Sequence, residues 1–270
     1  MPAIGAFWPL CGRRTIRPMS TSAAPDLARP NALRRWAAAF VRAPEYRANA
    51  ADLRTISIAG VEMSFRIAVA ITVVTFAILL DYSRTFIPRP IQDLGLAAEA
   101  MRYQSIERLV LFGLVPLAVV VLVFRDQPGR YGLRLGDWRW GVSLVVLGVV
   151  LMTPVVVALA QLPAFRAYYG PSTAPVADLL VTNSLDLFAA EFLIRGFLMF
   201  PLIRLFGGVG LLIATFPFTF SHLGKPEIET FSTLFGGLVY AWVDWRTGSI
   251  LYSAIAHVYI VTLLVVMAAG

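Results

Sequence analysis

Long apolar stretches separated by short polar segments make up most of the chain after residue 61. A helix that spans a bilayer needs about 20 mostly apolar residues. We predict spans over the following ranges: 64–81, 108–124, 141–160, 176–206, 208–223, 231–245 and 249–269. The pattern therefore predicts an all-α, polytopic transmembrane helical bundle of about six to eight transmembrane helices, without a second globular domain.

The stretch 176–206 is too long for one straight crossing, because a rise of about 1.5 Å per residue would extend it to about 50 Å. A break near Ser184 would divide it into a short lead-in or re-entrant piece and a helix that starts close to Asp186. Gly207 and Gly208 predict a turn between two antiparallel helices, and residues 246–248 predict a second turn.

Composition excludes an ordinary soluble domain, because 58% of the residues are hydrophobic, 14% are charged and the mean hydropathy is +0.73. Residues 1–60 hold nine arginines against three acidic residues, which gives this region +6 of the net charge of +7. The positive-inside rule then predicts a cytoplasmic N-terminus. We expect an integral, multi-pass protein of the bacterial inner membrane. The lipid bilayer accounts for the basic charge, and no nucleic acid partner is needed.

The chain is predicted to divide at residue 60 into a basic, largely disordered N-terminal region and a transmembrane domain over 61–270. Residues 1–30 lack periodicity, which favours disorder. Two alternatives are an organelle transit peptide, which their composition resembles, and a start codon assigned too far upstream. An interfacial helix is expected around 36–41. Cys11 is the single cysteine, which excludes an intrachain disulfide and a Cys-rich metal site.

Ionisable side chains inside apolar stretches are candidate functional groups, because each costs at least about 2.5–3.5 kcal/mol to insert. Glu191 and Arg195 are four residues apart and share one face of a helix. Taken by itself, the pair can also be explained as a buried salt bridge that fixes helix packing. Asp244 and Arg246, in contrast, are expected at a membrane surface.

The two histidines of the chain, His222 and His257, both lie in or beside apolar stretches. Imidazole titrates near neutrality and can both accept and donate a proton. Glu191 and His222 lie 16 and 14 residues from the predicted turn at 207–208, so both are about 21–24 Å from it. His257 follows the second turn by nine residues. His257 is therefore expected a little shallower than Glu191 and His222 but within their reach. For each histidine, the alternative to a catalytic role is a packed, hydrogen-bonded core residue.

Three segments, in this order, resemble the motifs of the CPBP family, which includes the type II CAAX prenyl proteases and bacteriocin-processing relatives. Residues 190–196 (Ala-Glu-Phe-Leu-Ile-Arg-Gly) resemble its E-E-x-x-x-R signature, and residues 218–222 (Phe-Thr-Phe-Ser-His) match F-x-x-x-H. Residues 247–250 leading to His257 resemble the third motif, H-x-x-x-N or H-x-x-x-D. With the loop at 131–139, the resemblance covers a protease core over about residues 128–265.

The resemblance implies an intramembrane endopeptidase that hydrolyses a peptide bond in a membrane-associated peptide or protein. In the family, the leading Glu and the second-motif His activate water, and the third-motif His and Asn stabilise the oxyanion. This chain has Ala190 in place of the leading Glu and Val261 in place of the Asn or Asp. One member of each pair is therefore retained.

Three carboxylates are candidates to replace the missing Glu. Asp186 lies one turn before Ala190 on the same face, and Glu191 would serve if the helix were rotated. Glu229 lies in a predicted loop after His222, and this segment resembles an H-x-G-K-P-x-x-E variant of bacterial members that lack the leading Glu. The alternative interpretation of Lys225 and Glu229 is a solvated loop pair.

Arg195 is expected to hold Glu191 in place. No cofactor is required, and a metal-free glutamate mechanism is preferred over zinc bound by two His and one Glu.

Two other classes of function compete with the protease. A catalytically inactive pseudoprotease would keep the fold and act as a peptide-binding, immunity or scaffold protein, and the replacements at Ala190 and Val261 favour it. A small transporter could use the same ionisable groups as a proton path. The absence of an inverted repeat from the sequence argues against transport.

Overall fold

The computed structural model describes residues 32–42, 44–94 and 97–270. The chain divides into two units, residues 1–39 and 40–270. Helix α1 (Ala32–Val41) occupies the region where the interfacial helix is expected. The expectations for residues 1–30 concern a part of the chain outside the described ranges.

The second unit begins with a β-hairpin and continues almost entirely as helices. Its first half contains, in chain order, β1 (Thr55–Ile58), β2 (Val61–Ser64), α2 (Phe65–Tyr82), α3 (Arg89–Gln92), α4 (Ala98–Arg108), η1 (Leu109–Leu114), α5 (Val115–Ala118), η2 (Val119–Val123), η3 (Pro128–Tyr131) and α6 (Trp138–Ala160). Its second half contains α7 (Pro163–Tyr169), α8 (Val176–Glu191), η4 (Phe192–Met199), α9 (Phe200–Phe206), α10 (Val209–Phe220), α11 (Glu227–Thr247) and α12 (Leu251–Ala269).

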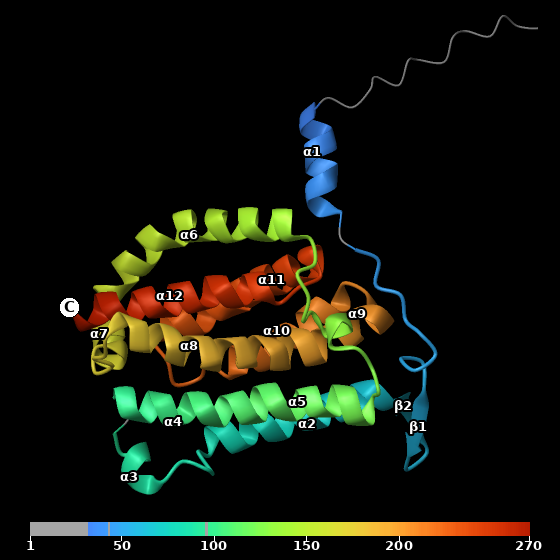
Figure 1. The fold of residues 1–270 in the computed structure, drawn as a ribbon, viewed down its shortest axis with the longest axis horizontal. Helices are drawn as coiled ribbons and strands as arrows, with labels where there is room; N and C mark the ends of the chain where they lie inside the picture. The colour runs from blue at the N-terminus through green and yellow to red at the C-terminus, as the bar shows by residue number, and fades with distance from the viewer. Residues whose placement is uncertain (1–31, 43, 95–96) are drawn as a thin grey trace, which may run out of the picture. The chain divides into compact units, whose positions relative to one another are not determined.

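The long helices of this unit lie side by side as a bundle (Figure 1). Helix α12 packs against α6 on one side and α8 on the other, α10 packs against α11, and α8 also contacts α4. The larger hydrophobic core is centred on η4 and α9, where side chains such as Phe197, Phe200 and Leu202 are fully buried. A smaller core joins α6, α7, α8 and α12.

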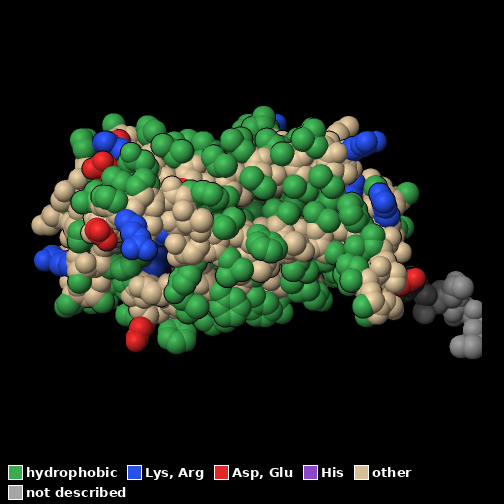
Figure 2. Space-filling model, turned by 90° about the horizontal axis from the view of Figure 1, so that it is seen from below, with side chains coloured by type: hydrophobic (Ala, Val, Ile, Leu, Met, Phe, Trp, Pro, Cys, Tyr) green, Lys and Arg blue, Asp and Glu red, His purple; other side chains and the backbone are tan. Residues whose placement is uncertain are grey.

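The surface of the bundle suits a bilayer. Four helical runs among the described residues are long and apolar enough to cross a membrane: 65–82, 98–123, 138–160 and 251–269. Helix α10 is apolar but shorter. On the face shown in Figure 2, hydrophobic side chains cover the middle and charged side chains gather toward the two ends. The predicted all-α polytopic bundle is confirmed.

The predicted break near Ser184 is wrong. Residues 176–206 form one continuous helical run through α8, η4 and α9, so residues 176–184 are the first turns of the motif helix and not a separate piece. Polar side chains in this part of the helix are accommodated by packing inside the bundle. Asn183 is buried and donates a hydrogen bond of 2.9 Å to the hydroxyl of Thr262 on α12.

Both predicted turns are confirmed. Gly207 (φ +59°) ends α9, and Gly248 (φ +72°) ends α11, which is backbone geometry that favours glycine. Helix α11, however, begins earlier than the predicted span at 231. Glu229 therefore lies in its first turn and not in a loop. Pro226 just before this helix and acidic residues in the first turn are typical helix-start signals.

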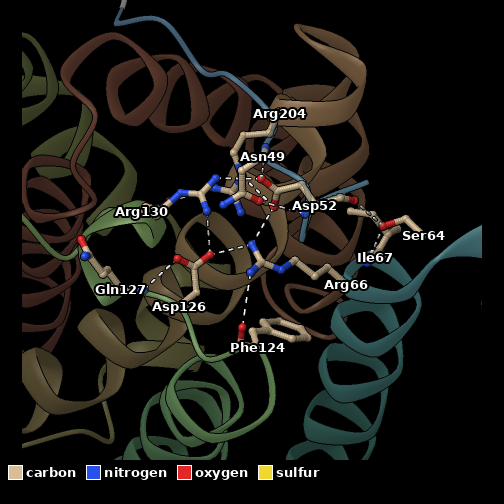
Figure 3. Close-up of polar contacts among 10 residues, drawn as sticks. All are labelled: Asn49, Asp52, Ser64, Arg66, Ile67, Phe124, Asp126, Gln127, Arg130 and Arg204. Atoms are coloured by element: carbon tan, nitrogen blue, oxygen red, sulfur yellow. Dashed lines mark hydrogen bonds and ion pairs between the residues drawn. The ribbon is translucent and has the colours of Figure 1, made fainter. Parts of the chain in front are cut away.

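A cluster of charged residues joins several segments of the bundle (Figure 3). The buried carboxylate of Asp52 accepts hydrogen bonds from Arg66 (2.7 Å), Arg130 (2.7 Å) and Arg204 (3.2 Å). Asp126 also accepts from Arg66 (2.6 Å) and Arg130 (2.9 Å). The segment before β1 is thus held against α2, η3 and α9.

Candidate active site

Glu191 and His257 form the centre of the site. Glu191 is the last residue of α8 and is completely buried. Its Oε1 lies 2.7 Å from Nδ1 of His257 on α12, and its Oε2 is paired with Arg195. A carboxylate can only accept, so His257 donates from Nδ1, and its Nε2 remains for other partners.

Arg195 lies in η4, where the helix widens into π-helical turns immediately after Glu191. Such turns within an α-helix are frequent at functional sites. The guanidinium is buried, lies 4.2 Å from the centre of the Phe218 ring and 5.3 Å from that of Tyr240. Its Nε and Nη2 have no hydrogen-bond partner. Among the carboxylates of the described residues, Arg195 therefore forms an ion pair only with Glu191.

His222 lies in the turn that follows α10. Its Nδ1 is 2.8 Å from the carbonyl oxygen of Phe218 and 3.3 Å from the Ser221 hydroxyl. A carbonyl only accepts, so this contact places the proton on Nδ1 and leaves Nε2 as an acceptor. The Phe218 ring is 4.6 Å from the His222 ring and 5.9 Å from the His257 ring, measured between centroids. The two imidazoles thus flank one phenyl ring.

Both histidines line two cavities. The larger, of about 140 Å³, is mostly apolar and also contains Glu229, Tyr240 and Val261. The smaller, of about 60 Å³, also contains Ala190, Arg108 and Lys225. The two positions at which the chain departs from the family motifs, Ala190 and Val261, therefore lie beside the histidines, one in each cavity.

Glu229 is the candidate carboxylate that shares a cavity with both histidines. Both of its oxygens lie 2.8 Å from the Tyr169 hydroxyl at the end of α7, and Lys225 donates to Oε1 at 2.9 Å. Burial raises the pKa of the Tyr169 phenol, and the neighbouring Glu229 charge adds to this effect. Burial opposes the charge of Lys225, but its contacts with Tyr169 and Glu229 outweigh that cost and raise the pKa of Lys225. The Glu229 carboxylate is therefore fixed by Tyr169 and Lys225 and is not freely solvated.

Asp186 is directed to a different partner. Its carboxylate accepts hydrogen bonds of 3.0 and 3.1 Å from Arg108 on α4. Arg108 is also bonded to Asp81 at 2.7 and 2.9 Å. Asp186 therefore belongs to an ion triad between helices, and the structure does not bring it to the histidines.

Sequence reasoning missed Tyr169, Tyr240 and Asp244. Asp244 is fully buried, accepts from the Ser253 hydroxyl at 2.9 Å and has an Oδ1 without a partner. Asp244 and Arg246, which were expected at a membrane surface, are both buried within the protein. The four-residue spacing of Tyr240 and Asp244, which places them on one helix face near Arg195, was the available signal.

The two His and one Glu considered as an alternative zinc site are not grouped as a ligand set. Among the described residues, no three His, Cys, Asp or Glu side chains are grouped closely enough to hold a metal ion. Nδ1 of His222 faces a backbone carbonyl, and Glu191 is already bonded to Arg195 and His257.

Residues 171–263 match the family model described as Rce1-like, type II CAAX prenyl endopeptidase. The matched range contains all three motif segments and all six candidate site residues. No curated protein and no solved structure matches the chain. The resemblance based on the motifs is confirmed.

Proposed function

We infer that this multi-pass membrane protein, whose residues 171–263 match the model of the Rce1-like type II CAAX prenyl endopeptidases, is an intramembrane endopeptidase. One observation carries the proposal: His222, His257 and Glu229 line a single cavity within the helical bundle. The substrate is a membrane-associated peptide or protein, because the lining of this cavity is otherwise mostly apolar.

The mechanism follows from the groups around the cavity. Glu229 and the unprotonated Nε2 of His222 take a proton from a water molecule, whose oxygen then attacks the scissile carbonyl carbon. His257, protonated on both ring nitrogens, donates from Nε2 to the resulting oxyanion, while Glu191 balances its charge. The proton taken from water passes to the leaving nitrogen as the C–N bond breaks. Arg195 keeps Glu191 in position.

We also propose that the protein lies in a bacterial inner membrane with its N-terminus in the cytoplasm. The orientation is supported by the excess of arginine in residues 1–60, which hold nine arginines against three acidic residues.

The direct test is cleavage of a membrane-peptide library by the purified protein in liposomes, with and without a chelator. His222→Ala and Glu229→Gln should each lower the cleavage rate by about 100-fold or more, because general base catalysis contributes about 10²–10⁴-fold. Glu227→Gln is the matched control: Glu227 lies in the same helical turn but is exposed and lines neither histidine cavity. Equal rates for Glu229→Gln and Glu227→Gln would remove Glu229 from the mechanism.

A pseudoprotease is the second candidate, and the positions of Ala190 and Val261 favour it. Each puts an apolar side chain into a histidine cavity where the family has a polar one. A folded wild type that binds peptides of the library without cleaving them, alone and with added divalent metal, would establish this alternative as a peptide-binding, immunity or scaffold protein.

A further inference from the structure

Glu107 on α4 is a buried carboxylate away from the histidine pair. Its side chain is 7% exposed. Oε1 accepts a hydrogen bond of 3.3 Å from the backbone N–H of Phe86, whereas Oε2 is buried and has no partner. Buried polar atoms are nearly always bonded, so an orphan carboxylate oxygen indicates a missing donor.

The cations near Glu107 have other partners. All three nitrogen positions of the Arg108 guanidinium are bonded to Asp81 and Asp186. Arg84 donates to the carbonyl oxygen of Gln92 at 3.4 Å. Within the described part of the chain, no cation forms an ion pair with Glu107. The missing donor therefore has to come from outside these residues.

Glu107 lines a cavity of about 350 Å³ that shares no residue with the two histidine cavities. Apart from Glu107, its lining is apolar or aromatic: Phe86, Ile87, Tyr103, Ile106, Val110 and Leu111. Phe86 and Tyr103 are 64% and 44% exposed. Aromatic rings beside a carboxylate favour an organic cation, since ring faces attract positive charge.

The cavity lies where α4 changes character. Within the helical run 98–123, residues 98–108 are largely polar and the continuously apolar part starts at Leu109. Glu107 therefore lies at the level where lipid headgroups meet hydrocarbon. An occupant at this depth has its charged end next to Glu107 and its apolar part along Ile106 and Val110.

We propose that this cavity binds a membrane lipid whose headgroup ends in a primary ammonium, with the ammonium bonded to the Glu107 carboxylate. The orphan Oε2 accepts a hydrogen bond. A primary ammonium supplies both an N–H donor and the charge opposite to the carboxylate, whereas a trimethylammonium has no N–H. The lipid fills the space between the 83–87 turn and α4.

The test measures thermal unfolding and native mass spectra of the full-length protein in detergent, with phosphatidylethanolamine, its mono-, di- and trimethylated forms, or phosphatidylglycerol added. Glu107→Gln removes the charge but keeps an oxygen that can accept from Phe86. Glu99→Gln is the matched control, because Glu99 is exposed on the same helix. A short-chain alkylamine serves as the soluble form of the same chemistry.

Phosphatidylethanolamine should bind wild type and Glu99→Gln at least about tenfold more tightly than Glu107→Gln, as expected when a charge-assisted bond is lost. In the wild type, affinity should fall with each added methyl group. This series needs no variant and remains informative if Glu107→Gln does not fold. Equal affinity for the trimethylated lipid, or equal lipid binding by Glu107→Gln, would overturn the proposal. Binding of the alkylamine without the lipid would overturn the lipid as the occupant.

Discussion

At the scale of single residues, Tyr169 connects α7 to the candidate site. Its hydroxyl holds both oxygens of Glu229 from an almost fully buried position. A carboxylate fixed in this way faces the cavity in one orientation, whereas a free side chain would sample several rotamers. Tyr169 is therefore a positioning residue, and α7 contributes to the site without supplying a reacting group.

Tyr169→Phe should lower the kcat of peptide cleavage by about 5–10-fold, because it removes a hydrogen bond worth about 1 kcal/mol. It should also shift the pH profile of kcat/KM, since Glu229 loses a donor, while thermal stability changes little. Tyr168→Phe is the control, because its ring packs on Tyr169 at 4.8 Å but its hydroxyl forms no hydrogen bond with Glu229. An unchanged pH profile would reduce Tyr169 to a packing residue.

The sequence predicted the histidines and Glu191 better than it predicted the carboxylate of the large cavity. His222, His257 and Glu191 stand out because ionisable groups are rare in apolar stretches. Helix rise placed Glu191 and His222 at matching depth and His257 a little shallower, within reach of them. In the structure, His257 is the histidine bonded to Glu191. Whether Asp186 or Glu229 faces the histidine cavity depends on their partners on other helices, Arg108 and Tyr169. An argument from the faces of a single helix contains no information on such partners.

At the scale of secondary-structure elements, the α9–α10 hairpin depends on a close backbone approach at Gly210. A Cβ at this position would lie 2.6 Å from the backbone nitrogen of Ile203 and 2.7 Å from the carbonyl carbon of Leu202. Neither backbone atom can move without shifting α9. The position of α10, and with it that of His222, therefore depends on this contact.

Gly210→Ala should lower the free energy of unfolding by about 1–3 kcal/mol through overpacking. It should also reduce peptide cleavage, because α10 carries His222 at its end. Gly208→Ala is the control, since a Cβ there would meet nothing within 4 Å. Unfolding of both variants in one detergent is the measurement, and equal midpoints would contradict the close approach.

The continuous helix at 176–206 shows where element prediction failed. A length of about 50 Å for a straight helix suggested a break near Ser184. In the structure, Asn183 is bonded to Thr262, and the helix widens into η4 without ending. The sequence contains no glycine or proline at 182–186 to end the helix, and this absence is a stronger signal than the length of the apolar stretch.

At the scale of the whole molecule, the Asp52–Asp126 cluster controls how stability depends on pH. Burial opposes ionisation of Asp52, but the Asn49 N–H, Arg204 and Arg130 outweigh it, so the pKa of Asp52 is lowered. The pKa of Asp126 is lowered in the same way by the Gln127 N–H, Arg66 and Arg130, against the effect of burial. A carboxyl with a lowered folded-state pKa stabilises the fold above its unfolded-state pKa, and this contribution is lost as pH falls through the folded-state value.

The unfolding midpoint of the wild type should therefore fall between about pH 5 and pH 2. Asp52→Asn should cost about 3–5 kcal/mol at neutral pH, because it leaves buried arginines without their anion, and should flatten the pH dependence. Glu45→Gln is the control, since its ion pair with Arg47 is exposed. A midpoint for Asp52→Asn that equals that of Glu45→Gln at every pH would contradict the role of the cluster.

Composition and the spacing of apolar stretches were enough to predict the bundle, because hydrocarbon permits few folds other than helices. The charge cluster was not predictable in this way. Asp52 lies in a segment whose basic character indicated a lipid surface, and its burial depends on arginines from α2, η3 and α9 that come together only in the fold.

The two cavities that meet at His222 and His257 have different linings, one mostly apolar and the other bordered by Arg108 and Lys225. Both cavities reach the same two imidazole rings, and Glu229 lines only the larger one. In the proposed reaction, the peptide and the water therefore meet in the larger cavity. A larger side chain that fills the smaller cavity, for example at Ala190, would leave this meeting place open.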